Sequence, residues 1–116
     1  MLLESDSIRI RHMIEAVRQA LDYAEDRDAA DIDADPPIKA LLIRNLEILG
    51  EAASRITPGL RAAHQEVPWR DMVDLRNRLI HAYFDIDMDI IWTTVQRALP
   101  GLLAQLEALL PPPGGR

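Results

Sequence analysis

The amino-acid sequence predicts an all-α protein, an up-and-down bundle of four to five helices. Apolar residues recur at three- and four-residue spacing in four long segments, which is the periodicity of amphipathic helices. The sequence shows no strand-like alternation, no glycine-rich phosphate loop and no internal repeat. Its 116 residues, 48% of them hydrophobic, are enough for one core. We therefore expect a single helical domain over residues 1–110 and a flexible proline- and glycine-rich tail over 111–116.

The first half of the chain predicts two helices joined by an acidic loop. The first helix is expected from about Ser7 to Glu25, with Ser5, Asp6 or Ser7 as its N-cap. Asp26 to Asp35 is acidic and poor in large apolar residues, so it predicts a loop. Pro36 and Pro37 then close the loop and lead into a central helix, expected from Ile38 to Ile56, whose first turn tolerates proline.

Three further features describe the central helix and the second half of the chain. Gly50 costs about 1 kcal/mol relative to alanine within a helix, so it indicates close approach by a neighbouring helix. Residues 60–66 predict at most a short helical turn, and a third helix is expected from Trp69 to Phe84, with Ile80 among its buried residues. A fourth helical stretch runs from about Asp87 to Leu110, and Pro100 should kink or split it.

Composition excludes several functional classes. The chain has no cysteine, so it has no disulfide, thiolate zinc site or thiol nucleophile. Its beginning has neither a basic flank nor a long apolar run, which predicts a cytoplasmic protein with no membrane partner. The net charge of -6 argues against a nonspecific nucleic-acid coat protein, and we expect no DNA partner. Residues 36–84 nevertheless carry 7 basic and 5 acidic side chains, so positive charge collects around the middle of the chain.

The second half of the third predicted helix combines Arg76, Asn77, His81 and Tyr83. A guanidinium can hold a phosphate, and an imidazole can move a proton near neutral pH. RNA cleavage without a metal needs a base for the 2'-hydroxyl, an acid for the leaving 5'-oxygen and a cation for the charge on phosphorus. His81 fits either proton-transfer role and Arg76 fits the third. The histidines lack metal-ligand spacing, so we expect no metal and no cofactor.

Helical geometry limits how these groups can meet. Arg76 and His81 lie about 140° apart around a regular helix and about 7.5 Å apart along it. Asn77 and His81 are four residues apart and face each other, so Asn77 can orient the imidazole. One phosphate can meet both Arg76 and His81 if the arginine reaches around the helix, if the helix loosens after Ile80, or if a second copy supplies part of the site. We favour the second copy, in a two-fold dimer.

Each residue also has a structural interpretation. His81 would satisfy the last carbonyls of its helix, and Arg76 would pair with Asp74 or Glu51. Tyr83 would be a core aromatic. Arg44 and Glu51 lie on one stripe of the central helix, where they form either a solvated pair or the lining of a cleft. We favour the solvated arrangement for Arg44.

At these residues the chain resembles the HepT-like ribonuclease toxins of the HEPN superfamily. Arg76, His81 and Tyr83 match the family signature Arg-x4-His-x-Tyr, and Asn77 is the polar residue that the superfamily prefers after the arginine. Residues 44–53 and 69–92 also look similar, and the resemblance runs from the first helix to about residue 110. It implies a HEPN-like homodimer with Arg76 and His81 in a cleft between protomers, acting as a metal-independent endoribonuclease on RNA.

The resemblance also implies a partner. Toxins of this kind, in type VII-like toxin-antitoxin pairs, are usually neutralised by a nucleotidyltransferase antitoxin, MntA, that transfers AMP from ATP to the motif tyrosine. That residue is Tyr83 here, so the chain is expected to be AMPylated at Tyr83 by an MntA-like antitoxin. The alternative is a catalytically weak or inactive HEPN dimer that serves as a binding module for the nucleotidyltransferase.

Overall fold

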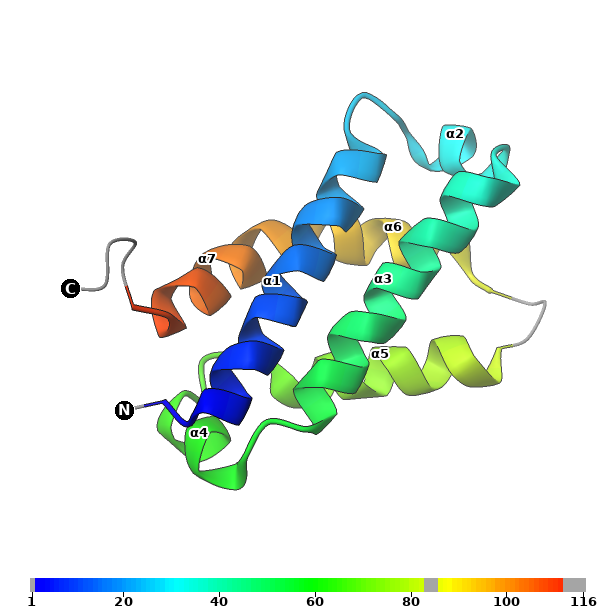
Figure 1. Ribbon diagram of the computed structural model, residues 1–116. Helices are drawn as coiled ribbons and strands as arrows, with labels where there is room; N and C mark the ends of the chain where they lie inside the picture. The colour runs from blue at the N-terminus through cyan, green and yellow to red at the C-terminus, as the bar shows by residue number, and fades with distance from the viewer. Residues whose placement is uncertain (1, 83–85, 112–116) are drawn as a thin grey trace.

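The computed structural model describes residues 2–82 and 86–111, and it is an all-α bundle (Figure 1). Over these residues it contains no strand, so the predicted fold class is confirmed. The elements in chain order are α1 (Glu4–Ala24), α2 (Ala29–Asp33), α3 (Pro36–Ser54), α4 (Pro58–Ala63), α5 (Trp69–His81), α6 (Met88–Thr93), the π-helical η1 (Thr94–Ala98) and α7 (Leu99–Leu109).

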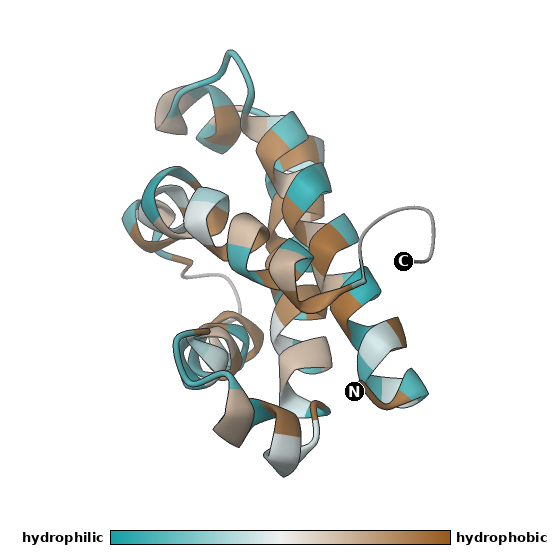
Figure 2. Ribbon diagram, turned by 90° about the vertical axis from the view of Figure 1, so that its left-hand side faces the viewer, coloured by the Kyte–Doolittle hydropathy of each residue, from teal (hydrophilic) through white to brown (hydrophobic). Residues whose placement is uncertain are grey.

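Helix α3 is the centre of the arrangement. It packs against α1 on one side and α5 on the other, while α7 and η1 pack against α1. Figure 1 shows α1 and α3 side by side and running in opposite directions, with α4 at the end where α1 begins. Apolar and polar surfaces alternate around the helices, as amphipathic helices require (Figure 2). The largest fully buried side chains come from α1, α2, α3, α6, α7 and two connecting segments: Ile10, Met13, Val17, Ile32, Leu42, Leu46, Leu49, Ile56, Val67, Ile91, Leu99 and Leu106.

The beginning of α1 differs from its prediction. The helix starts at Glu4, its N-cap residue is Leu3, and no side chain caps it. Asp6, one of the three predicted caps, is instead 2% exposed. Its Oδ1 accepts a hydrogen bond from the Thr57 backbone N–H at 3.0 Å, and its Oδ2 accepts one from the Thr57 hydroxyl at 2.5 Å. The Asp6 carboxylate, which the local sequence predicted as a cap of α1, therefore binds Thr57, 51 residues further along the chain.

The acidic segment is not wholly a loop, because it contains α2. Asp28 caps this helix, and Asp28 and Asp31 exchange side-chain-to-backbone hydrogen bonds in a capping box. Ile32 is fully buried and anchors α2 in the core. Helix propensity alone did not indicate this short element, since a single buried isoleucine and two well-placed aspartates hold it.

The prediction about Gly50 is confirmed. A Cβ atom at this position would lie 2.6 Å from the carbonyl oxygen of Met72 and closer still to the Cβ of Arg76. Only glycine lets α5 approach α3 so closely. The proline pair is also confirmed in the first turn of α3, where Asp35 Oδ1 accepts the Ile38 N–H at 3.3 Å.

The remaining predictions concern the second half of the chain. The short turn at residues 60–66 is a helix that begins and ends earlier, α4. Ile80 was expected in the core but is 42% exposed. The third helix was predicted to end near Phe84, which lies outside the described residues. Helix α5 ends at His81. Pro100 does interrupt the last helical stretch: it sits in the first turn of α7, directly after the π-helical η1. No helix in the described parts is long and apolar enough to span a bilayer.

Candidate active site

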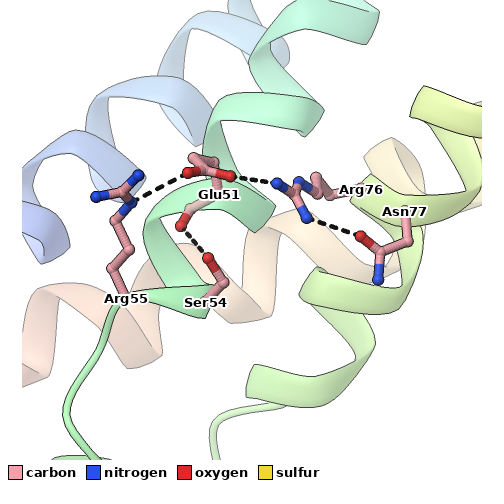
Figure 3. Close-up of polar contacts among 5 residues, drawn as sticks. All are labelled: Glu51, Ser54, Arg55, Arg76 and Asn77. Carbon is pink, nitrogen blue, oxygen red and sulfur yellow. Dashed lines mark hydrogen bonds and ion pairs between the residues drawn. The ribbon is translucent and has the colours of Figure 1, made fainter.

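Arg76 is held by two oxygen atoms at the crossing of α3 and α5. Its Nη2 donates a hydrogen bond to Glu51 Oε2 at 2.5 Å, and its Nη1 donates to Asn77 Oδ1 at 2.8 Å (Figure 3). The side chain is 28% exposed, so the guanidinium remains partly open to solvent. The structural interpretation in which Arg76 pairs with Glu51 is therefore confirmed.

Glu51 bridges two arginines. While Oε2 accepts from Arg76, Oε1 accepts from Arg55 Nε at 3.0 Å, and Figure 3 shows the carboxylate between the two guanidinium groups. The hydrogen bond from Arg55 and the charge of Arg76 hold the pKa of the Glu51 carboxyl below its ordinary value of 4.5. Glu51 is therefore an anion at neutral pH, and its negative charge stands beside the candidate phosphate-binding group.

A cavity of about 520 Å³ opens beside this network, between α1, α3 and α5. Its walls carry four arginines but only two glutamates, in a chain whose net charge is -6. The lining residues are Ile8, Arg9, His12, Arg44, Glu47, Ile48, Glu51, Ala52, Arg55, Arg76 and Ile80. Arg44 thus lines the cleft, and because Glu51 bonds to Arg55 and Arg76, the solvated Arg44–Glu51 pair that we favoured is wrong.

His81 does not share the cavity with Arg76. His81 is exposed at the end of α5 and is not among the lining residues. Within the described contacts the Asn77 amide oxygen accepts from Arg76, and no hydrogen bond joins Asn77 to His81. Tyr83 lies outside the described residues. One copy of the chain therefore joins Arg76 to Asn77 by a hydrogen bond, while His81, one turn further along α5, does not line the cavity.

Sequence reasoning missed Arg9, His12 and Arg55 at the cavity. Arg9 and His12 lie three residues apart on α1, and Arg55, the C-cap residue of α3, follows Glu51 by four residues, so each pair shares one face of its helix. That spacing was visible in the sequence. What it does not show is that the two faces meet, because this depends on how α1 packs against α3. No group of three or more potential metal ligands was found among residues 2–82 and 86–111.

Comparison with known proteins places this geometry in a family. The model of the family described as Ribonuclease HepT-like matches residues 13–109. The chain belongs to the HepT-like ribonuclease family. This membership, together with the all-α bundle, confirms the resemblance to HEPN proteins that the signature residues suggested.

The chain is similar to three proteins that are named as ribonucleases or candidate RNases. The chain is 34% identical over 100 residues to a Thermococcus cleftensis protein named "Probable ribonuclease HepT", covering 86% of this chain and 91% of that one. It is 35% identical over 95 residues to a candidate RNase, MJ1380, of Methanocaldococcus jannaschii, covering 82% and 87%. A candidate RNase of Caldanaerobacter subterraneus, TTE0752, is 30% identical over 101 residues, covering 87% and 90%. No solved structure matches this HepT-like chain with significance.

Proposed function

We propose that this HepT-like protein is a metal-independent endoribonuclease, with Arg76 and His81 as its catalytic residues. The observation that carries the proposal is the placement of Arg76: it is held by two oxygens at the mouth of an arginine-rich cavity, in a chain that belongs to a ribonuclease family. A preorganised, partly desolvated guanidinium is well suited to stabilise charge that develops on a phosphoryl group.

In the proposed reaction the 2'-hydroxyl of RNA attacks the adjacent phosphorus and the 5'-oxygen leaves. Arg76 would stabilise the additional negative charge on the phosphoryl oxygens, and His81 would act as the base for the 2'-hydroxyl or as the acid for the 5'-oxygen. Asn77 would support the reaction through Arg76, since its amide oxygen accepts one of the guanidinium hydrogens.

A homodimer would complete the site. Arg76 lines the cavity whereas His81 does not, so a second copy that presents its own His81 to this cavity would supply the missing proton-transfer group. The surface around the cavity supports such pairing. Ile8, Ile48 and Ile80 all line it and are between 36% and 42% exposed, so a second copy could bury them.

Within the same proposal the partner is a nucleotidyltransferase antitoxin of the MntA type, which would AMPylate Tyr83. Tyr83 follows the end of α5 by two residues, on the same segment as Arg76 and His81. A phosphodiester attached there would be an anion near the candidate phosphate site and would compete with RNA for Arg76. Mass spectrometry after incubation with the partner and ATP would show the gain of AMP on the wild-type chain and its loss in Tyr83→Phe.

The enzyme proposal is tested by incubating the purified chain with total cellular RNA in excess EDTA. We expect cleavage by the wild-type chain and none by Arg76→Ala or His81→Ala, with circular dichroism showing that both variants remain folded. Arg78→Ala is the matched control because Arg78 is an exposed arginine on the same helix that does not line the cavity, and it should retain cleavage. Cleavage that survives His81→Ala would overturn the assignment of His81.

One observation favours a second function, that of an inactive binding module. Glu51 already occupies the guanidinium of Arg76, so in this arrangement RNA would have to displace a carboxylate. A folded, unmodified wild-type chain that is inert on RNA but binds the nucleotidyltransferase tightly would establish the module in place of the enzyme.

A further inference from the structure

The cavity beside Arg76 contains more positive charge than one catalytic arginine requires. Arg9 comes from α1, Arg44 from α3, Arg55 from the C-cap of α3, and Arg76 from α5, so arginines from three helices line one cavity. Four of the 13 basic residues of an acidic chain line this single cavity. Such segregation of charge indicates an anionic ligand.

Arg9 and Arg44 differ from Arg55 and Arg76 in their partners. Arg55 and Arg76 both bind Glu51, whereas neither Arg9 nor Arg44 forms an ion pair within the described part of the chain. Among residues 2–82 and 86–111, Arg9 donates a side-chain hydrogen bond only to the carbonyl oxygen of Ser5 on its own helix, at 3.3 Å, and both Arg9 and Arg44 border the cavity. Their guanidinium groups therefore keep N–H donors for an incoming acceptor. A guanidinium can bind a phosphate through two parallel hydrogen bonds.

A second cavity shows that this charge pattern is particular to one site. A space of about 560 Å³ between α1 and α7 is lined by Arg11 and Arg18, but Glu15, Asp22 and Glu107 share it. Arg18 donates to Glu107 at 2.5 Å, so at least one of these arginines already has a carboxylate partner. The two cavities have similar volumes and share α1, yet only the one beside Arg76 has an excess of arginine.

We propose that Arg9 and Arg44 form a binding subsite for the backbone phosphates of single-stranded RNA, adjacent to the phosphate held by Arg76. This inference rests on the proposed ribonuclease function and extends it to two residues that lie outside the family signature. Arg55, the C-cap residue of α3, follows Arg44 by eleven residues, or about 16 Å along the helix axis. A stacked nucleic-acid strand carries one phosphate per about 3.4 Å of its length, so the cavity wall spans several phosphates.

The occupant is argued from charge and from the walls of the cavity. Phosphate binding by arginine does not depend on the base sequence of the RNA. It therefore suits a cavity wall in which no arrangement of side chains is recognisable as one that distinguishes bases. In the proposed dimer a second copy borders this cavity at Ile8, Ile48 and Ile80. The competing arrangement is a second copy that also fills the space between the arginines, and the experiment below distinguishes it from RNA.

The test measures RNA binding in a His81→Ala background, so that cleavage cannot remove the ligand. Fluorescence anisotropy with a short labelled oligouridylate in EDTA would give the Kd at several salt concentrations. We expect Arg9→Ala and Arg44→Ala each to raise the Kd by roughly tenfold, because each removes a charge-assisted hydrogen bond to phosphate. Each should also lower the salt slope by about 0.7 for every phosphate that the variant no longer neutralises.

Arg11→Ala is the matched control: it removes the same charge from the same helix as Arg9 but lines the other cavity. Its Kd should stay within about twofold of the parent, with an unchanged salt slope. If Arg9→Ala and Arg44→Ala behave like Arg11→Ala, the subsite is refuted. It is also refuted if sedimentation shows that these two variants fail to self-associate while each folded chain binds RNA as before, since the cavity would then be an interface between copies.

Failure of the subsite and failure of the proposed function give different results. Cleavage by the wild-type chain combined with unchanged binding in both arginine variants would remove the subsite and keep the enzyme. An inert wild-type chain whose RNA binding depends on Arg9 and Arg44 would keep the subsite and remove catalysis.

Discussion

Gly50 determines how close α5 can lie to α3, and therefore where Arg76 sits. Gly50→Ala would place a methyl group against the Cβ of Arg76 and the carbonyl of Met72. Because neither backbone can yield without shifting a helix, we expect the free energy of unfolding to fall by about 1–3 kcal/mol. Urea denaturation would measure this change.

Gly101→Ala is the control for Gly50→Ala. A Cβ at Gly101 would meet nothing within 4 Å, and the residue lies within α7. Replacing glycine by alanine in an open helical position should leave stability unchanged or raise it by up to about 1 kcal/mol. Equal effects of the two substitutions would show that close approach is not the reason for glycine at position 50.

Glu51 gives a prediction about pH. Arg55 and Arg76 hold the carboxyl pKa below 4.5, so the folded protein binds this proton less tightly than the unfolded chain. The stability that Glu51 contributes is therefore complete above that ordinary value and is lost as pH falls through the lower, folded-state pKa. We expect Glu51→Gln to be less stable than wild type at neutral pH and to lose stability less steeply on acidification between about pH 5 and pH 3.

The measurement is the urea unfolding free energy at a series of pH values. Glu47→Gln is the comparison, because Glu47 borders the same cavity on the same helix but accepts no hydrogen bond from an arginine in the described parts of the structure. It should retain the wild-type slope. A Glu51→Gln slope as steep as that of wild type would mean that the ion pairs in Figure 3 do not stabilise the folded state.

The sequence indicated some residues of the candidate site, but it could not show which residues of different helices contact one another. The signature singled out Arg76 and Asn77, and Glu51 was one of two expected partners of Arg76, which the structure confirms. Arg9, His12 and Arg55 were missed because nothing local in the sequence says which helix faces meet. Arg44 was misassigned for the same reason: its helix stripe was correct, but its surroundings depend on α1.

Among the elements, the start of α1 depends on a contact with the beginning of α4. Asp6 is buried and accepts two hydrogen bonds from Thr57, whose donors would have no acceptor in Asp6→Ala. An unsatisfied buried donor costs about 1–3 kcal/mol, so we expect destabilisation of at least that order in urea denaturation. Glu4→Ala, an exposed acidic residue in the same turn, should cost less than about 1 kcal/mol. Similar costs for the two variants would contradict this tether.

Apolar periodicity in the sequence predicted the long helices but not the short helix α2 or the exposure of Ile80. The long helices were predicted because each has a sustained apolar stripe, and the interruption at Pro100 follows from the missing N–H and the bulk of the ring. Helix α2 was missed because it is too short for a stripe and depends on one buried side chain, Ile32. Ile80 fits the periodicity of α5 but borders an open cavity instead of the core.

For the whole molecule, the decisive question is whether Arg76 and His81 act across two copies. Mixing Arg76→Ala and His81→Ala chains tests this directly. If each site takes its arginine from one copy and its histidine from the other, a mixed dimer has one intact site and should recover about half of the wild-type cleavage per dimer. If both residues come from the same copy, the mixture stays inactive, as each variant is alone.

The carboxylate of Glu51 also has a consequence for which anions reach Arg76. Because the fold holds Glu51 beside the guanidinium, its carboxylate competes with incoming anions at a high effective concentration. Chloride, acetate or a single free phosphate would have to break this pair with one contact. A chain of phosphates that also engages other arginines of the cavity gains from several contacts at once. The protein would thus favour anions that carry several linked phosphates over anions that make a single contact, such as chloride, acetate or free phosphate.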